Sequence, residues 1–236
     1  MPEKIEDILE KNLQSIKFAF GSTKMNIEKY KNDGWGLCQN GFKDLHEIIK
    51  NHEKPHLSVL EFGSGTSTQF FVDIVENKVK NLTIESYDND PNWCYKDSEK
   101  HNFLNLKMRD LVECDDQSFA SMFVSKEYNR DVMNIQTAKP HTRQKNCFYD
   151  IKESDLCREY DIVVIDGPNG NGRSFAFLHL KDVLKDGAFV FIDDYTHYPF
   201  VNTMKHFFNV ELYSESNVSN SQQYAIYKIK KTSELK

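Results

Sequence analysis

The sequence lacks the features of a membrane or secreted protein. Its apolar runs all fall short of the roughly 18 residues that a membrane-spanning helix needs. The first ten residues are charged and have no apolar core of the kind found in a signal peptide. We therefore expect a cytoplasmic protein without a membrane span.

Cysteine is scarce and shows no pattern. The five cysteines form no C-x-x-C pair and do not cluster with histidine at the spacing of a zinc site. This argues against a structural zinc site and against a disulfide framework. We interpret all of them as free thiols: Cys38, Cys94, Cys114, Cys147 and Cys157.

An excess of positive charge is also missing. The chain carries 30 lysines and arginines against 36 aspartates and glutamates, which gives a formal net charge of −6 at pH 7. Because nucleic-acid-binding domains present a basic surface, this balance speaks against a nucleic-acid partner. The length of 236 residues suits one core, so we expect a single domain over residues 1–236.

Short β-rich runs alternate with helical stretches after residue 57. Five strands are expected, at residues 58–62, 82–87, 104–108, 161–165 and 188–192. Their alternation with helices predicts a parallel sheet with crossover helices, and residues 210–213 and 224–229 should pair as an antiparallel hairpin. The predicted fold is α/β and Rossmann-like, with a mostly parallel sheet, an antiparallel C-terminal hairpin and helices on both faces.

Two segments lie outside this alternation. Residues 1–57 should form a helical cap or lid, with an amphipathic helix over 4–20 and a second helix over 41–51. Residues 110–159 are too long for a simple connection, and we expect an inserted helix plus a loop there.

The sharpest motif is a glycine turn placed directly after the first strand. Gly63 and Gly65 permit close approach of a ligand to the backbone, and the residues that follow, Ser64, Thr66 and Ser67, open a helix. Amides at a helix N-terminus favour a negatively charged group such as a carboxylate. We expect a cofactor at this turn, although a tight turn without a ligand would give the same motif.

Two residues near the turn indicate which cofactor it would bind. Thr68 replaces the third glycine of the dinucleotide fingerprint, and Glu61 would repel a pyrophosphate but attract an amino group. Both disfavour NAD and favour S-adenosylmethionine. Asp88, at the end of the next strand, is the expected ribose ligand. Alternatively residues 88–91 form only a polar turn, and Asp90 replaces Asp88 if the strand ends later.

Three aspartates follow two further strands. Asp166 ends the strand over 161–165, and Asp193 and Asp194 end the strand over 188–192. If these strands are neighbours, the carboxylates converge and would suit a divalent cation such as Mg²⁺ or Mn²⁺. The alternative is that one aspartate caps a helix or pairs with Arg173 or Lys205, which leaves no metal site.

Residues that could bind or deprotonate the acceptor of a methyl group lie nearby in the sequence. Asp166, Asp194 and His197 are the expected catalytic residues, with His141 as a second choice of base. Arg173 follows a glycine-rich loop and would bind an anionic or hydroxyl-rich acceptor, or else lie on the surface. Trp35, between two glycines, would close over the site unless it packs on the sheet.

The ordered set of motifs resembles the class I S-adenosylmethionine-dependent methyltransferases. The resemblance rests on residues 61–65, Asp88, residues 166–168 and the pair Asp193 and Asp194, and covers about residues 59–230 without the insertion. It implies their seven-stranded fold. The residues 165–167 and 192–195 look like those of metal-dependent sugar O-methyltransferases, and residues 34–37 like those of glycan methyltransferases, so the resemblance implies a sugar or glycan hydroxyl as acceptor.

Three other functions stay open at this point. The acceptor could be a protein side chain or another small molecule, with no need for a metal. The chain could also be a non-catalytic module that binds the cofactor, or an NAD-dependent oxidoreductase, which Glu61 and Thr68 disfavour.

Overall fold

The computed structural model describes residues 25–30, 36–113, 147–156, 158–168, 171–195, 200–217 and 223–230. The helix expected over residues 4–20 lies outside these ranges. Within them, no helix is both long and apolar enough to cross a membrane.

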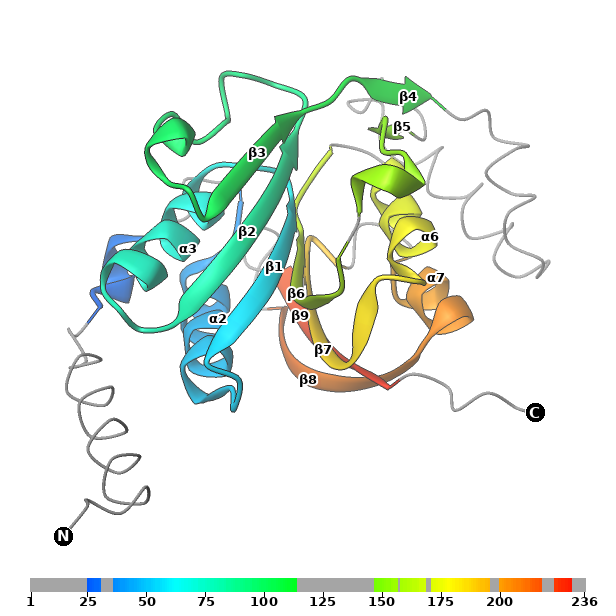
Figure 1. The fold of residues 1–236 in the computed structure, drawn as a ribbon. Coiled ribbons are helices and arrows are strands. Elements are labelled where there is room, and N and C mark those ends of the chain that lie inside the picture. Colours follow the sequence, from blue (N-terminus) through cyan, green and yellow to red (C-terminus); the bar gives the residue numbers. More distant parts are fainter. Residues whose placement is uncertain are drawn as a thin grey trace, which may run out of the picture.

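A seven-stranded sheet forms the centre of the molecule (Figure 1). Its strands run in the order β3-β2-β1-β6-β7-β9-β8. The first five are parallel to one another, and β9 is antiparallel to both β7 and β8. The strands are β1 (His56–Phe62), β2 (Asn81–Asp88), β3 (Leu104–Met108), β6 (Tyr160–Ile165), β7 (Leu184–Asp193), β8 (Asn209–Asn217) and β9 (Gln223–Lys230). The predicted mostly parallel sheet with an antiparallel hairpin is confirmed.

Helices cover both faces of this sheet (Figure 1). The helices α2 (Gln39–Asn51) and α3 (Thr66–Glu76) lie on one face, and α6 (Ala176–Leu180) and α7 (Phe200–Phe207) lie on the other. The central strand β6 presents apolar side chains to both faces of the sheet. Ile162 and Val164 pack toward α2 and α3, whereas Val163 and Ile165 pack toward α6. Two cores therefore hold the strand ends in fixed relative positions.

The ends of the insertion are strands. β4 (Leu111–Glu113) pairs antiparallel with β5 (Cys147–Tyr149), a pairing that was not predicted, while residues 114–146, where most of the expected helix and loop would fall, lie outside the described residues. Three-residue strands are too short to show a period in the sequence. Short 3₁₀ helices complete the described elements: η1 (Ile27–Lys29), η2 (Ser98–Lys100), η3 (Glu153–Asp155) and η4 (Asn171–Phe175).

Helix α2 lies so close to the sheet that it needs a glycine. A Cβ on Gly41 would lie 2.7 Å from Cζ of Phe191, whose ring stacks on Tyr224 with centroids 5.1 Å apart. We expect Gly41→Val to lower the free energy of unfolding by about 2 kcal/mol, because the stacked pair must shift. Asn40→Val, at an exposed position of the same helix, should change it by less than about 0.5 kcal/mol. Urea denaturation measures both, and equal losses would contradict this packing.

Candidate functional site

The glycine turn brings two parallel strands into contact. It joins β1 to α3, and Gly63 has a φ of +97°. A Cβ on Gly63 would lie 2.8 Å from the backbone nitrogen of Gly167, at the end of β6. Gly65, with a φ of +144°, then starts α3. The turn therefore has no room for a Cβ on Gly63 at the point where the β1 and β6 ends meet.

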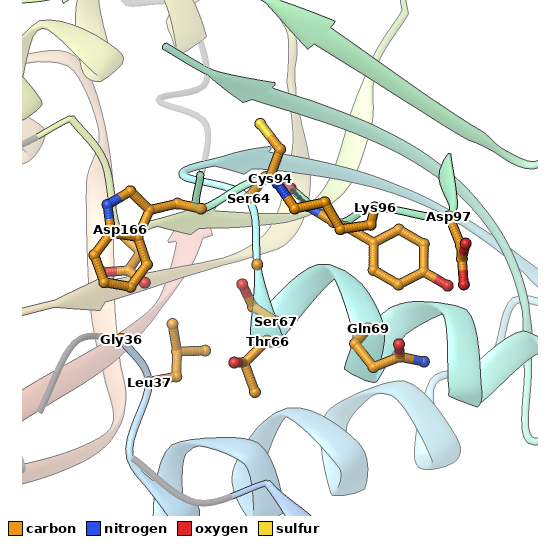
Figure 2. A pocket seen from close by; sticks show the side chains of 13 residues that line it. Gly36, Leu37, Ser64, Thr66, Ser67, Gln69, Cys94, Lys96, Asp97 and Asp166 are labelled. Atoms are coloured by element: carbon orange, nitrogen blue, oxygen red, sulfur yellow. Dashed lines mark hydrogen bonds between the residues drawn. The ribbon is translucent and has the colours of Figure 1, made fainter. Parts of the chain in front are cut away.

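A pocket of about 390 Å³ opens beside this turn (Figure 2). Ser64–Ser67 and Gln69 contribute one wall, with the N-terminus of α3 at its base. The other walls come from residues 36–37, which precede α2, from residues 93–97, which follow β2, and from Asp166. The volume is within the usual range for a small-molecule site. Four of the predicted cofactor residues, those at positions 64–67, line it.

Glu61 and Thr68 support the turn from below. Glu61 is fully buried, and its Oε2 accepts hydrogen bonds from Thr68 Oγ1 at 2.5 Å and Ser86 Oγ at 2.6 Å. Thr68 Oγ1 also accepts a hydrogen bond from the Gly65 amide at 3.0 Å. The threonine that replaces a third glycine thus connects the turn to the buried carboxyl. Burial raises the pKa of Glu61 to about 7, against the lowering effect of the hydroxyl groups that donate to it.

This pKa predicts a pH dependence of stability. The native carboxyl holds its proton more tightly than the unfolded one, so its contribution is fully present below about pH 4.5 and is lost as the pH rises through about 7. The contribution is on the order of 3 kcal/mol. We expect Glu61→Gln to remain folded and to lose less stability than the wild type between pH 5 and pH 8.

Thermal unfolding across that pH range measures the effect. Glu99→Gln, at an exposed position, is the matched control and should follow the wild type. Identical pH profiles for Glu61→Gln and the wild type would contradict the assignment.

The Asp88 carboxylate accepts hydrogen bonds from backbone amides in the structure. It is 5% exposed, its Oδ2 accepts from the Ser64 amide at 2.7 Å, and its Oδ1 accepts from the Asn89 and Asp90 amides at 2.7 and 2.8 Å. The polar turn considered as the alternative is therefore present. Because each carboxylate oxygen has two lone pairs, these bonds leave acceptor capacity, and the ribose role of Asp88 stays a prediction.

The segment over residues 93–97 was not identified from the sequence. The amide of Tyr95 donates to Ser64 Oγ at 3.2 Å, and the carbonyl oxygen of Trp93 would lie 3.3 Å from a Cβ on Gly65. These contacts place the segment against the glycine turn, with the Trp93 side chain about half exposed. The one feature of the sequence that could have indicated this segment is its position directly after the strand that ends in Asp88.

The three aspartates converge as expected, because β6 and β7 are neighbours. Asp193 donates a side-chain hydrogen bond to Asp166. Burial raises the pKa of Asp166 to about 6, an effect that Arg173 opposes and Asp194 reinforces. Burial, followed by the charges of Asp166 and Asp194, raises the pKa of Asp193 well above its usual value. The hydrogen bond between the two side chains lowers the pKa of Asp166 and raises that of Asp193, and with a pKa of about 6 Asp166 is mostly ionised at neutral pH.

Arg173 supplies the counter-charge for this cluster. Its side chain is 5% exposed, and its guanidinium nitrogens lie 3.8 Å from Asp166 Oδ1 and 3.7 Å from Asp194 Oδ2. Arg173 therefore does not lie on the surface. Across the part of the chain that the structure describes, no three His, Cys, Asp or Glu side chains form a group that could hold a metal ion. The structure thus gives no support for the expected metal at Asp166, Asp193 and Asp194, and the alternative of an arginine pairing is found.

Three predicted acceptor residues cannot be placed: Trp35, His141 and His197 lie outside the described residues. Their roles stay predictions. Gly36, next to Trp35, does reach the site, since a Cβ there would lie 3.4 Å from Asp166 Oδ2.

Tyr149, from the insertion, also reaches the point where β1 and β6 meet. Its hydroxyl oxygen would lie 2.3 Å from a Cβ on Gly167, and its ring stacks on Phe62. Burial, and then the charge of Asp88, raises its pKa well above the usual value, so the hydroxyl stays protonated. No signal in the sequence distinguished this tyrosine from others in the insertion.

Comparison with known proteins identifies the family. A family model described as "Methyltransferase domain" matches residues 60–195. No match is found among curated proteins. Similar solved structures include a precorrin-6y C5,15-methyltransferase from Geobacter metallireducens, with 12% identity, 91% of this chain and 99% of that chain covered, and a TM-score of 0.49. An O-methyltransferase from Bacillus cereus has 12% identity, coverages of 98% and 93%, and a TM-score of 0.47.

The match spans more than half of the sequence and includes the glycine turn, Asp88 and the aspartates at the ends of β6 and β7. The chain therefore belongs to the class I S-adenosylmethionine-dependent methyltransferases.

Proposed function

We propose that the chain transfers the methyl group of S-adenosylmethionine to a hydroxyl group of a sugar or glycan. The observation that carries the proposal is the position of Asp166, an ionised carboxylate in the pocket that opens beside the glycine turn (Figure 2). A carboxylate there can accept the proton of a hydroxyl acceptor. The resemblance of residues 165–167 and 192–195 to sugar O-methyltransferases supports a sugar as that acceptor.

The residues of the turn fit the methyl donor. The backbone of Ser64–Ser67 surrounds the N-terminus of α3, where a carboxylate group is favoured, and the absence of a Cβ at Gly65 leaves room for a ligand. Asp88 would accept hydrogen bonds from ribose hydroxyls, and Glu61 would attract an amino group. S-adenosylmethionine, when bound, supplies an electrophilic methyl group on a sulfonium.

The chain's own residues then have two tasks. The first is alignment, which supplies a large part of the rate in a displacement of this kind. The second is acceptance of a proton, for which Asp166, with a pKa of about 6, is mostly ionised at neutral pH, while its hydrogen bond with Asp193 orients it. His197 is the second candidate for the base.

An acceptor screen tests the proposal. The purified chain is incubated with S-adenosylmethionine and, in parallel, with monosaccharides, oligosaccharides, nucleotide sugars and peptides, and products are detected by mass spectrometry. We expect a gain of one methyl group on a carbohydrate. Methylation of peptides alone would contradict the sugar assignment, and cofactor binding with no product from any acceptor would favour a non-catalytic module.

A further inference from the structure

We propose that Arg173 takes the place of a divalent cation in this site, so that the positive charge beside the carboxylate cluster comes from the chain itself. The cluster consists of Asp166, Asp193 and Asp194, at the ends of β6 and β7. This inference concerns the charge of the site and holds whichever acceptor is methylated.

The position of Arg173 is fixed by backbone contacts on both sides. Its Nε donates a hydrogen bond to the Pro168 carbonyl oxygen at 2.7 Å. The residue before it, Gly172, lies against β5 so closely that a Cβ would come within 1.7 Å of the Cys147 carbonyl oxygen. Helix η4 is thereby held against β5, and the guanidinium is directed toward the aspartates rather than toward solvent.

The charges show what this position does. The guanidinium lies between two neighbouring carboxyl groups, 3.8 Å from Oδ1 of Asp166 and 3.7 Å from Oδ2 of Asp194. These separations suit an ion pair but are too long for direct hydrogen bonds. An arginine is permanently charged, so it compensates the carboxylates at every physiological pH. A hard cation would need several carboxylate oxygens of the same cluster at roughly 2.0–2.6 Å, where it would compete with the buried positive charge.

Removal of the arginine should expose the difference. In Arg173→Met an unbranched, uncharged side chain replaces the arginine, which leaves the carboxylates uncompensated. A divalent cation that binds the native state then raises the melting temperature by mass action. Arg173→Lys keeps the charge and serves as the matched control.

The experiment is thermal unfolding of the wild type, Arg173→Met and Arg173→Lys, each in EDTA, MgCl2 and MnCl2, together with titration of S-adenosylhomocysteine under the same conditions. We expect the melting temperatures of the wild type and Arg173→Lys to show no response to either cation, and the affinity for S-adenosylhomocysteine to stay within about twofold across the conditions. Arg173→Met should melt lower in EDTA and recover part of the loss in Mg²⁺ or Mn²⁺.

A wild type that is stabilised by Mg²⁺ or Mn²⁺ would overturn the proposal. So would an Arg173→Met variant as stable as the wild type and indifferent to both cations. If Arg173→Met does not fold, the wild type and Arg173→Lys decide alone: the proposal stands if neither responds to the cations and falls if either does. Failure of the sugar screen leaves this result unaffected, because no acceptor is present.

Discussion

Gly63→Ala is expected to abolish binding of S-adenosylhomocysteine and to lower the free energy of unfolding by roughly 3 kcal/mol or more. Two effects add up at this position. The φ of +97° is costly for alanine, and the new Cβ would lie 2.8 Å from the Gly167 nitrogen and 3.0 Å from the Asp166 carbonyl carbon. Because those atoms belong to backbone, the β1 and β6 ends must separate. Urea denaturation and calorimetric titration measure the two losses.

Gly187→Ala is the matched control for this substitution. Gly187 also has a positive φ, of +78°, but a Cβ there would meet nothing closer than 3.7 Å, the Lys228 Cε. The free energy of unfolding of Gly187→Ala should therefore fall by about 1–2 kcal/mol from backbone strain alone, and the variant should keep its cofactor affinity. Equal effects at both positions would show that the contact between the strand ends does not matter.

Asp166→Asn is expected to reduce methyl transfer about 100-fold or more while S-adenosylhomocysteine affinity stays within a few fold. The substitution keeps the shape of the side chain but removes its capacity to accept a proton. In the wild type the rate should fall as the pH is lowered through about 6, because Asp166 then takes up a proton. That step should be missing from the residual activity of the variant.

The assay uses the acceptor found in the screen. Asp182→Asn, the same change at a side chain that is 80% exposed on the surface, should behave as the wild type does. A rate in Asp166→Asn that is unchanged and still falls through pH 6 would assign the base to another residue, with His197 the next to test.

Much of the sheet could be predicted because its strands carry strong local signals. The run at residues 162–165 is apolar throughout, as a strand covered on both faces must be, and the observed β6 adds only Tyr160 to the predicted range of 161–165. The boundaries of β3 agree with the predicted range of 104–108. The C-terminal hairpin was predicted too short, since β8 continues through polar residues to Asn217. There, pairing with β9 decides the structure rather than apolar periodicity.

The parts of the site that were missed depend on contacts between distant segments. Residues 93–97 show no motif, and their approach to Gly65 follows only from the folding of the β2 end over the turn. Tyr149 reaches Gly167 through the pairing of β4 with β5, two strands of three residues each. Arg173 was predicted as a ligand of the acceptor, but its burial beside the aspartates comes from the packing of Gly172 on β5.

Isothermal titration of the purified chain with S-adenosylhomocysteine and, separately, with NAD distinguishes a methyltransferase site from a dinucleotide site. We expect saturable binding of S-adenosylhomocysteine, the same in EDTA and in Mg²⁺, and no binding of NAD. Binding of NAD without binding of S-adenosylhomocysteine would contradict the functional assignment, although the fold described by the seven-stranded sheet would stand.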